Sequence, residues 1–258
     1  MSINNKPDDK SADTLSTAAF SDEHKAGVYE AIYQRRDMRH FRSESLPEDL
    51  VERLLNVAHA APSVGLMQPW RILQIESPDV REQLHQLVEQ ERLETARALG
   101  KRSEDFMQLK VQGILECPQL WVISLMDQRQ RHVFGRRTLP QMDLASASCA
   151  IQNIWLAARA EGVGVGWVSI FDPQKLQTLL GMPEDAEPIA ILCIGYVNEF
   201  YDEPLLIQEG WAERGNLEDY VMTDRWDTAK AQRSQQQWDH ADAASAEDPL
   251  SPQQSEEK

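Results

Sequence analysis

The segment from Asp143 to Ala160 constrains the fold more than any other part of the chain. Its apolar side chains recur at helical spacing over several turns, and they are Leu144, Ala147, Ala150, Ile151, Ile154, Trp155 and Ala158. Gly162 follows as a stop signal. Because this helix is apolar on much of its circumference, it needs cover on several sides, and we expect it at the centre of the fold.

Strand-like segments flank this helix in the sequence. The run Trp70–Ile75 alternates as a half-buried strand does, and Leu120–Leu125 is a short apolar run suited to a buried one. After the helix come Val165–Ile170 and Ile189–Val197, of which the second is the strongest strand signal in the chain. The chain therefore mixes helices and strands in alternation.

Further helical signals lie between these strands and before them. Val28, Ile32 and Tyr33 share one helical face, and the run Leu46–Asp49 opens a second helix that ends before Pro62. A long charged helical region separates the first two strands, and a short helix spans Pro173 to Leu180. There is no internal repeat, so we expect one globular domain over residues 23–227.

Both ends of the chain are polar. Residues 1–22 hold few large apolar groups, and residues 228–258 lack apolar periodicity apart from the lone Trp238. Such compositions do not offset the entropy cost of ordering a chain. We therefore expect a disordered N-terminal tail and a disordered acidic C-terminal tail.

The charge balance restricts the partners. The chain carries 42 acidic against 26 basic side chains, a formal charge of -16. This charge opposes binding to the nucleic-acid backbone and to anionic membrane surfaces, so we expect neither as a partner. A phosphate-bearing ligand would need its own local arginines.

Other residue counts exclude several kinds of site. Cys117, Cys149 and Cys193 lie far apart, which indicates neither a zinc ribbon nor a disulfide framework. The histidines lack metal-ligand spacing, so we expect no bound metal. Neither a signal peptide nor an apolar run of about 18 residues, the length that crosses a membrane, is present. We expect a cytoplasmic protein.

The run Arg35–Arg39 places three guanidinium groups around one carboxylate at the end of a helix. Guanidinium forks pair bidentately with phosphate, so two of these arginines could bind one ligand while the third holds Asp37. The alternative is a solvated basic helix end that the helix dipole favours. The pattern alone leaves both interpretations open.

A second cluster, Ala61–Trp70, leads from a helix into a strand with two prolines and a glycine between. Ser63 and Gln68 offer a hydroxyl and an amide that could read the polar edge of a heteroaromatic ring. A helix cap and turn would use the same residues. Neither interpretation is excluded by the sequence.

The third cluster, Glu161–Ser169, contains three alternating glycines. They follow a helix and precede a strand, whereas a dinucleotide fingerprint needs the strand first, so we reject a Rossmann site. These glycines either let the backbone approach a flat ligand closely or cap the helix. Ser169 lacks the G-x-S-x-G elbow of a hydrolase nucleophile.

Taken in this order, the three clusters resemble the nitroreductase-like flavoproteins, and their residues are similar to those of the 5,6-dimethylbenzimidazole synthase branch. The resemblance covers about Ala26 to Trp226. It also rests on three further stretches, namely Gly135–Thr138 with Met142–Asp143, Ala150–Ala160, and Gly166–Ile170. The two tails have no counterpart in the family pattern.

The resemblance implies an α+β fold in which helices flank a central mixed sheet. It also implies an intertwined homodimer that binds FMN at the interface between the chains. The implied cofactor-binding residues are Arg35, Arg36, Asp37, Met38, Arg39, Ser63, Gln68, Gly166 and Arg214. Among them, Arg214 matches a late arginine that completes the phosphate site, and Met38 is an apolar variation within its motif.

The resemblance further implies an oxidoreductase that breaks reduced FMN down with O2, giving 5,6-dimethylbenzimidazole, the lower ligand of cobalamin, and D-erythrose 4-phosphate. Asp37 and Ser169 match the residues that mark this branch, which makes them the expected catalytic pair. A carboxylate held among arginines stays ionised at neutral pH and could accept a proton, while a hydroxyl could orient oxygen or a proton path. NAD(P)H would act only through a separate flavin reductase.

Two rival functions remain from the sequence. An ordinary NAD(P)H-dependent nitroreductase or flavin reductase would keep its FMN intact and oxidise NAD(P)H steadily. A non-catalytic flavin-binding protein would release reduced flavin unchanged.

Overall fold

The computed structural model describes residues 19–242, and side chains as far as residue 235. The strands are β1 Trp70–Gln74, β2 Gln119–Leu125, β3 Val163–Val168 and β4 Glu187–Tyr196. The α-helices are α1 Asp22–Gln34, α2 Glu48–His59, α3 Pro78–Ala98, α4 Ser103–Gln108, α5 Met142–Ala160, α6 Pro173–Leu179, α7 Leu205–Gln208, α8 Leu217–Tyr220 and α9 Thr228–Asp242. Three 3-10 turns are η1 Val64–Leu66, η2 Gly100–Arg102 and η3 Arg129–Arg131. The expected disorder of residues 1–18 and 243–258 lies outside the described residues.

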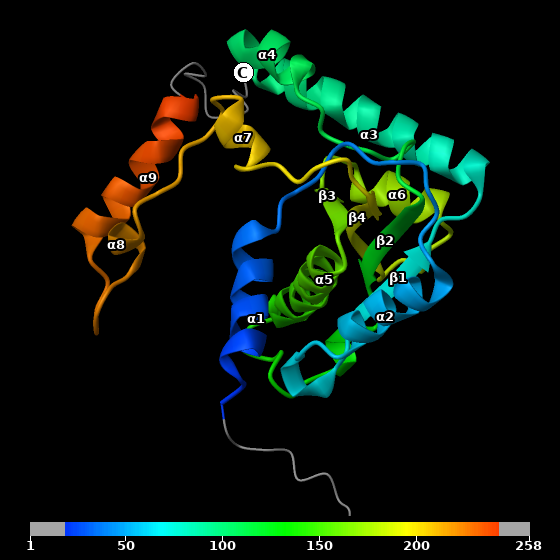
Figure 1. Ribbon diagram of the computed structural model, residues 1–258, viewed down its shortest axis with the longest axis horizontal. Helices are drawn as coiled ribbons and strands as arrows, with labels where there is room; N and C mark the ends of the chain where they lie inside the picture. The colour runs from blue at the N-terminus through cyan, green and yellow to red at the C-terminus, as the bar shows by residue number, and fades with distance from the viewer. Residues whose placement is uncertain (1–18, 243–258) are drawn as a thin grey trace, which may run out of the picture.

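The strands form one sheet in the order β1-β2-β4-β3, in which each neighbouring pair is antiparallel. An isolated bridge between Asp37 and Val165 is parallel, which makes the sheet mixed at its β3 edge. The segment after α1 therefore lies beside β3, although more than a hundred residues separate the two in the sequence (Figure 1).

Helices cover both faces of the sheet (Figure 1). Helices α2 and α5 pack on one face, and α3 and α6 pack on the other. Along β2, Trp121 and Ile123 belong to the core on the α5 side, while Leu120 and Val122 belong to the core on the α3 side. This alternation follows from the two-residue period of a strand, and it accounts for the continuous apolar run in the sequence.

The expected central position of α5 is confirmed. Ile151, Ile154 and Ala158 are fully buried between the sheet, α2 and α1. By contrast, the expected apolar face of α1 is largely uncovered, because Ile32 and Tyr33 are 41% and 74% exposed. A helical period identifies which side chains share a face, but it does not say whether this chain supplies the surface that covers them.

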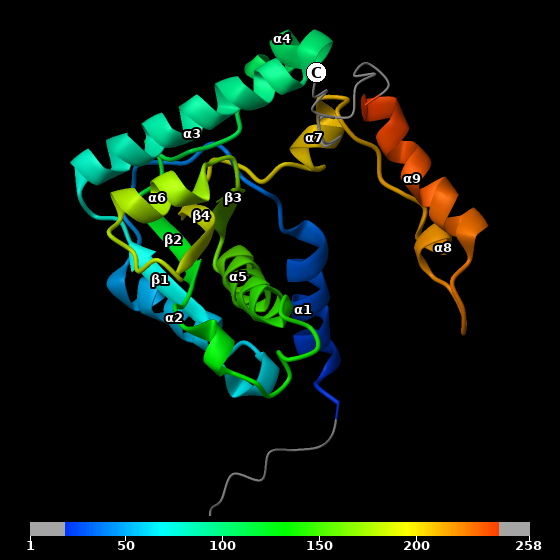
Figure 2. The same ribbon diagram turned by 180° about the vertical axis from the view of Figure 1, so that it is seen from behind.

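The prediction that the chain is unstructured from residue 228 is wrong over Thr228–Asp242, where α9 forms. Asp227 begins this helix, since its Oδ1 accepts the backbone N–H of Ala229 at 3.0 Å. The ion pair between Arg233 and Asp219, 2.7 Å long, joins it to α8. Helix propensity, the cap at Asp227 and the contact with α8 account for this helix, although it lacks apolar periodicity. Both views place the α8–α9 pair away from the sheet (Figures 1 and 2).

Within residues 19–242, no helix is both long and apolar enough to span a membrane.

Candidate functional site

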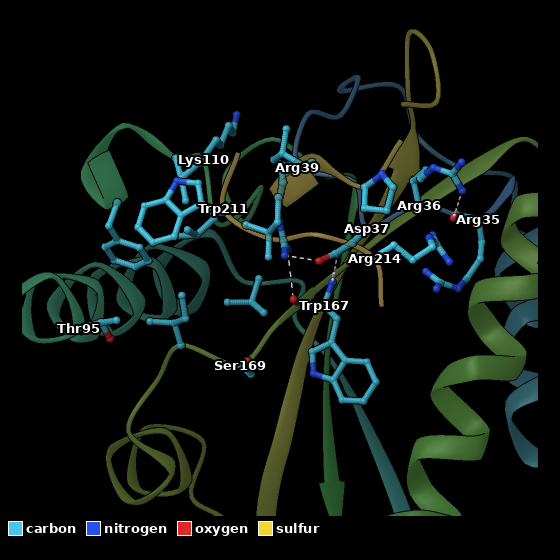
Figure 3. Close-up of a pocket in the computed structure, with 18 of the residues that line it drawn as sticks. Arg35, Arg36, Asp37, Arg39, Thr95, Lys110, Trp167, Ser169, Trp211 and Arg214 are labelled. Carbon is cyan, nitrogen blue, oxygen red and sulfur yellow. Dashed lines mark hydrogen bonds and ion pairs between the residues drawn. The ribbon is translucent and has the colours of Figure 1, made fainter. Parts of the chain in front are cut away.

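A cavity of about 880 Å³ opens where the end of α1, the exit of β3 and the α3–α4 region meet. Its volume lies in the range of about 300–1,000 Å³ that is usual for small-molecule sites. Residues 201–214, which we call the strap, close its remaining side. The predicted site residues that line this cavity are Arg35, Arg36, Asp37, Arg39, Ser169 and Arg214 (Figure 3).

The glycines of β3 bring the arginine run against the sheet. A Cβ on Gly166 would lie 2.2 Å from the carbonyl oxygen of Met38, and a Cβ on Gly164 would meet the Met38 side chain at 3.0 Å. Met38 N donates to the carbonyl of Val165 at 3.0 Å, which fixes this close approach. Met38 and Gly166, both predicted to bind the cofactor, thus lie behind the cavity wall and position the residues that line it.

The sequence left two roles open for the glycines, helix capping and close approach, and the structure shows each role at different glycines. Gly162 caps α5 with a φ of +72°, a conformation that only glycine adopts freely. Gly164 and Gly166 permit close approach, but protein approaches them and not a ligand: Val197 and Met38 at Gly164, and Met38 and Arg39 at Gly166.

Asp37 is held from both sides at the cavity wall. Its Oδ1 accepts the backbone N–H of Trp167 at 2.8 Å, and its Oδ2 pairs with the guanidinium of Arg39. Arg39 also donates to the carbonyl of Trp167 at 3.2 Å, so the three residues form one small network (Figure 3). With 38% of its side chain exposed, the carboxylate keeps free lone pairs toward the cavity.

Burial raises the pKa of the Asp37 carboxyl above its ordinary value, and it outweighs Arg39, the Trp167 N–H and Arg35, each of which lowers that pKa. We expected the arginines to dominate. The structure places the carboxylate in the cavity wall instead, where the surrounding protein atoms remove part of the hydration of its charged form. A carboxylate with a raised pKa is a stronger base than an ordinary aspartate.

The end of the cavity nearest α1 carries excess positive charge. Within residues 19–242, the guanidinium groups of Arg35 and Arg214 have neither an ion pair nor a hydrogen bond, although Arg35 lies 5.0 Å from the ring centre of Trp155. Figure 3 shows both of them close to Arg36. Burial lowers the pKa of Arg36, and the charges of Arg35 and Arg214 lower it further. Such a cluster lowers its free energy by binding an anion, and a phosphate fits its chemistry.

The opposite end of the cavity is apolar, and the sequence did not predict its residues. Trp211 stacks against the guanidinium of Arg102 at 3.7 Å and meets Phe106 edge to face. Lys110 lines this end and pairs with Glu116. Trp211 falls in the same short motif as Arg214, but no local pattern indicates that it meets the α3–α4 region.

Ser169 follows directly on β3 and is exposed at the cavity. In the described part of the chain, its hydroxyl has no hydrogen-bond partner, so it is available to a ligand.

Ser63 and Gln68 lie elsewhere, beside the start of α5. The Ser63 hydroxyl accepts the backbone N–H of Gln68 at 3.0 Å, and Ser146 on α5 accepts that of Val64 at 3.1 Å. Leu66 and Gln68 adopt positive φ angles of 52° and 47°, a strained pairing for residues other than glycine. The cavity is at the other end of α5, where Trp155 donates to the carbonyl of Arg36 at 2.9 Å.

Within residues 19–242, no group of three or more His, Cys, Asp or Glu side chains is placed to hold a metal ion.

Comparisons with known proteins identify the family of this chain. The model of the nitroreductase family matches residues 32–196. A 5,6-dimethylbenzimidazole synthase of Rhodobacter capsulatus is 40% identical over 197 residues, which cover 75% of this chain and 95% of that protein. One of Rhodospirillum rubrum is 40% identical over 190 residues, covering 72% and 89% respectively. The crystal structure of oxidised iodotyrosine deiodinase bound to FMN and 3-iodo-L-tyrosine is similar in fold, with a TM-score of 0.62, 20% identity, and coverage of 77% of this chain and 100% of that one.

Proposed function

This chain belongs to the nitroreductase family and, within it, to the 5,6-dimethylbenzimidazole synthases, and from this premise we propose that its cavity binds reduced FMN and directs its O2-dependent fragmentation. The products are 5,6-dimethylbenzimidazole, which serves as the lower ligand of cobalamin, and D-erythrose 4-phosphate. The membership confirms the α+β nitroreductase-like fold and the family resemblance that the sequence indicated.

The observation that carries the proposal is a single cavity with a cationic end and a basic carboxylate. Arg35 and Arg214 offer guanidinium groups that have no ion pair among the described residues, where a phosphate would bind. Asp37 faces the same cavity with a raised pKa, and Ser169 adds a free hydroxyl. These residues fit the phosphate and the ribityl chain of FMN.

Reduced flavin, when bound, supplies the electrons that O2 accepts. The protein contributes position and proton transfer. Asp37 Oδ2, anchored by Arg39, takes a proton from the bound molecule while Trp167 N–H keeps Oδ1 in place. Ser169 Oγ orients oxygen or relays a proton, and the apolar end near Trp211 and Phe106 limits the access of water.

We place the site at the interface of a homodimer. Ser63 and Gln68 lie at the far end of α5 from the cavity, and a helix of this length, 19 residues, spans roughly 28 Å. They reach a flavin only if a second copy brings them to it. The uncovered side chains of Ile32 and Tyr33 offer an apolar surface for that copy.

The test is product analysis. Purified protein is incubated with FMN, a separate flavin reductase, NADH and air, and the products are searched by mass spectrometry for 5,6-dimethylbenzimidazole. We expect the product only when the reductase is present, and we expect Ser169→Ala to reduce its yield. FMN recovered intact while NADH is consumed in step with an added nitroaromatic would instead identify an ordinary nitroreductase. Reduced FMN recovered unchanged under air would identify a binding protein.

A further inference from the structure

The strap, residues 201–214, carries two side chains that face opposite ends of the cavity. Arg214 belongs to the cationic end, and Trp211 belongs to the apolar end beside Phe106 (Figure 3). Both positions depend on how the strap is fastened to the body of the protein.

Backbone hydrogen bonds connect the residues in the middle of the strap. Trp211 N donates to the carbonyl of Leu206 at 2.7 Å, and Gly210 closes this turn with a φ of +67°. Glu209 N donates to the carbonyl of Leu205 at 2.9 Å. A displacement at the start of the strap is therefore passed on through α7 to Trp211.

Arg36 fastens the start of the strap. Its Nη2 donates to the carbonyl of Asp202 at 2.5 Å, while its Nη1 donates to the carbonyls of Tyr33 and Arg35, both at 2.8 Å. The guanidinium thus joins the last turn of α1 to the strap. Tyr201 supports this contact, since its hydroxyl lies 2.9 Å from His40 Nδ1.

These hydrogen bonds occupy most of the N–H groups that Arg36 could donate to a phosphate. Both terminal nitrogens point at backbone carbonyls, and its buried Nε has no hydrogen-bond partner in the part of the chain that the structure describes. Arg35, its neighbour in the sequence, makes no such bonds among the described residues. Two adjacent arginines that look equivalent in the sequence therefore have different environments.

We propose that Arg36 is a positioning residue: it anchors the strap so that Arg214 meets the phosphate and Trp211 closes the apolar end, whereas Arg35 binds the phosphate directly. The proposal rests on the proposed function for the identity of the ligand. It predicts that recognition of the phosphate and closure of the apolar end both depend on the hydrogen bonds of Arg36.

The first test needs no ligand. Hydrogen exchange is measured on the full chain with Arg36→Lys and, as the matched control, with Arg35→Lys, both of which keep the charge. A lysine has one nitrogen in place of the two with which Arg36 contacts α1 and the strap. We therefore expect residues 201–214 to exchange about tenfold faster in Arg36→Lys, equivalent to ~1.4 kcal/mol, and to be unchanged in Arg35→Lys. Equal exchange of residues 201–214 in the two variants would show that Arg36 does not anchor the strap.

The second test uses oxidised FMN and riboflavin as probes, because only FMN carries the phosphate. The ratio of their Kd values is compared for Arg36→Lys, Arg214→Gln and the double variant. We expect Arg36→Lys to lower the preference for FMN by about tenfold alone and by less than about twofold in the Arg214→Gln background, because it acts through Arg214. Independent losses in the double variant would instead make Arg36 a direct phosphate ligand.

The two tests distinguish failure of the proposed function from failure of the positioning role of Arg36. If the wild-type protein binds neither flavin, oxidised or reduced, the proposed function is wrong, and hydrogen exchange still decides whether Arg36 holds the strap. If the wild type prefers FMN and Arg36→Lys keeps that preference, the proposed function stands and the positioning role is wrong.

Discussion

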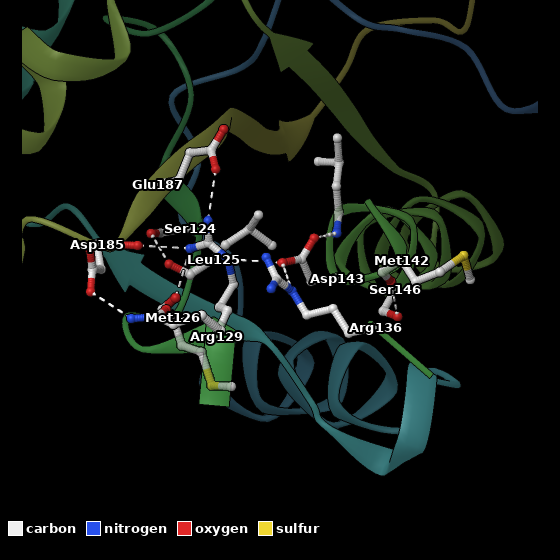
Figure 4. A network of polar contacts seen from close by, with 12 residues as sticks. Ser124, Leu125, Met126, Arg129, Arg136, Met142, Asp143, Ser146, Asp185 and Glu187 are labelled. Atoms are coloured by element: carbon white, nitrogen blue, oxygen red, sulfur yellow. Dashed lines mark hydrogen bonds and ion pairs between the residues drawn. The ribbon is translucent and has the colours of Figure 1, made fainter. Parts of the chain in front are cut away.

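Two aspartates near the two ends of α5 are each held by arginine, and they have different environments. Asp143, at the start of α5, has a side chain only 5% exposed, and its Oδ2 pairs with Arg129 and Arg136, both at 2.9 Å (Figure 4). Asp37, near the other end, pairs with Arg39 and remains 38% exposed to the cavity.

The partners of the arginines make the difference. Arg129 also pairs with Glu187 and donates to the carbonyls of Met126 and Asp185, so its charge and its donors are satisfied (Figure 4). Around Asp37, Arg35 and Arg214 form no ion pair with a carboxylate among the described residues. A network that is already neutral stabilises the loop before α5, whereas one with unpaired cations and an accessible carboxylate can bind an anion and move a proton.

The largest expected effect comes from Asp37→Asn. Asparagine keeps the shape and can still accept the Trp167 N–H, but it is no base. We expect the yield of 5,6-dimethylbenzimidazole to fall by at least about 100-fold while the Kd for FMN changes by only a few fold. Product analysis beside flavin titration measures both. Asp143→Asn is the control and should retain its yield per folded molecule; an unchanged yield in Asp37→Asn would remove the base role.

Asp143→Asn should instead act on stability. The substitution leaves two largely buried guanidinium groups without their shared carboxylate, which we expect to cost about 3–5 kcal/mol. Urea unfolding at neutral pH measures this loss.

Asp37→Asn should cost less, and the pKa gives the reason. Because its folded pKa is raised, ionisation of Asp37 weakens the folded state as pH rises through that pKa, and asparagine does not ionise. Equal losses in the two variants would mean that both aspartates are structural.

Arg214→Gln should affect ligand affinity alone. Arg214 is exposed and has no ion pair in the described part of the chain, so unfolding should be almost unchanged. Losing one charge-assisted contact should reduce the preference for FMN over riboflavin by about tenfold. A titration at low and high salt checks this, since the effect should shrink as salt rises. An unaltered preference would place the phosphate elsewhere.

The smallest effect is a shift in pH dependence. Arg39 lowers the pKa of Asp37 against the larger effect of burial, so Arg39→Gln should raise that pKa further. The acidic limb of the rate profile, measured at saturating reduced FMN, should therefore move to higher pH. A limb that stays in place would show that Asp37 does not limit the rate.

Local patterns in the sequence determined much of the fold. The apolar period of Asp143–Ala160, the stop at Gly162 and the alternation in Trp70–Ile75 each gave an element that the structure contains. They could do so because helical and extended periods depend on neighbouring residues alone. The motif Arg35–Arg39 likewise indicated the cationic end of the cavity, because several arginines close together in the sequence already concentrate positive charge.

Only the tertiary structure showed that the neighbouring arginines differ in their contacts. The two arginines before Asp37 look alike in the sequence, yet the guanidinium of Arg36 donates to the carbonyl of Asp202 while the guanidinium of Arg35 has no hydrogen bond among the described residues. It also separated Ser63 from the cavity by the length of α5. Hydrogen bonds and burial depend on which distant segments come into contact. The residues next to a side chain in the sequence do not determine those contacts.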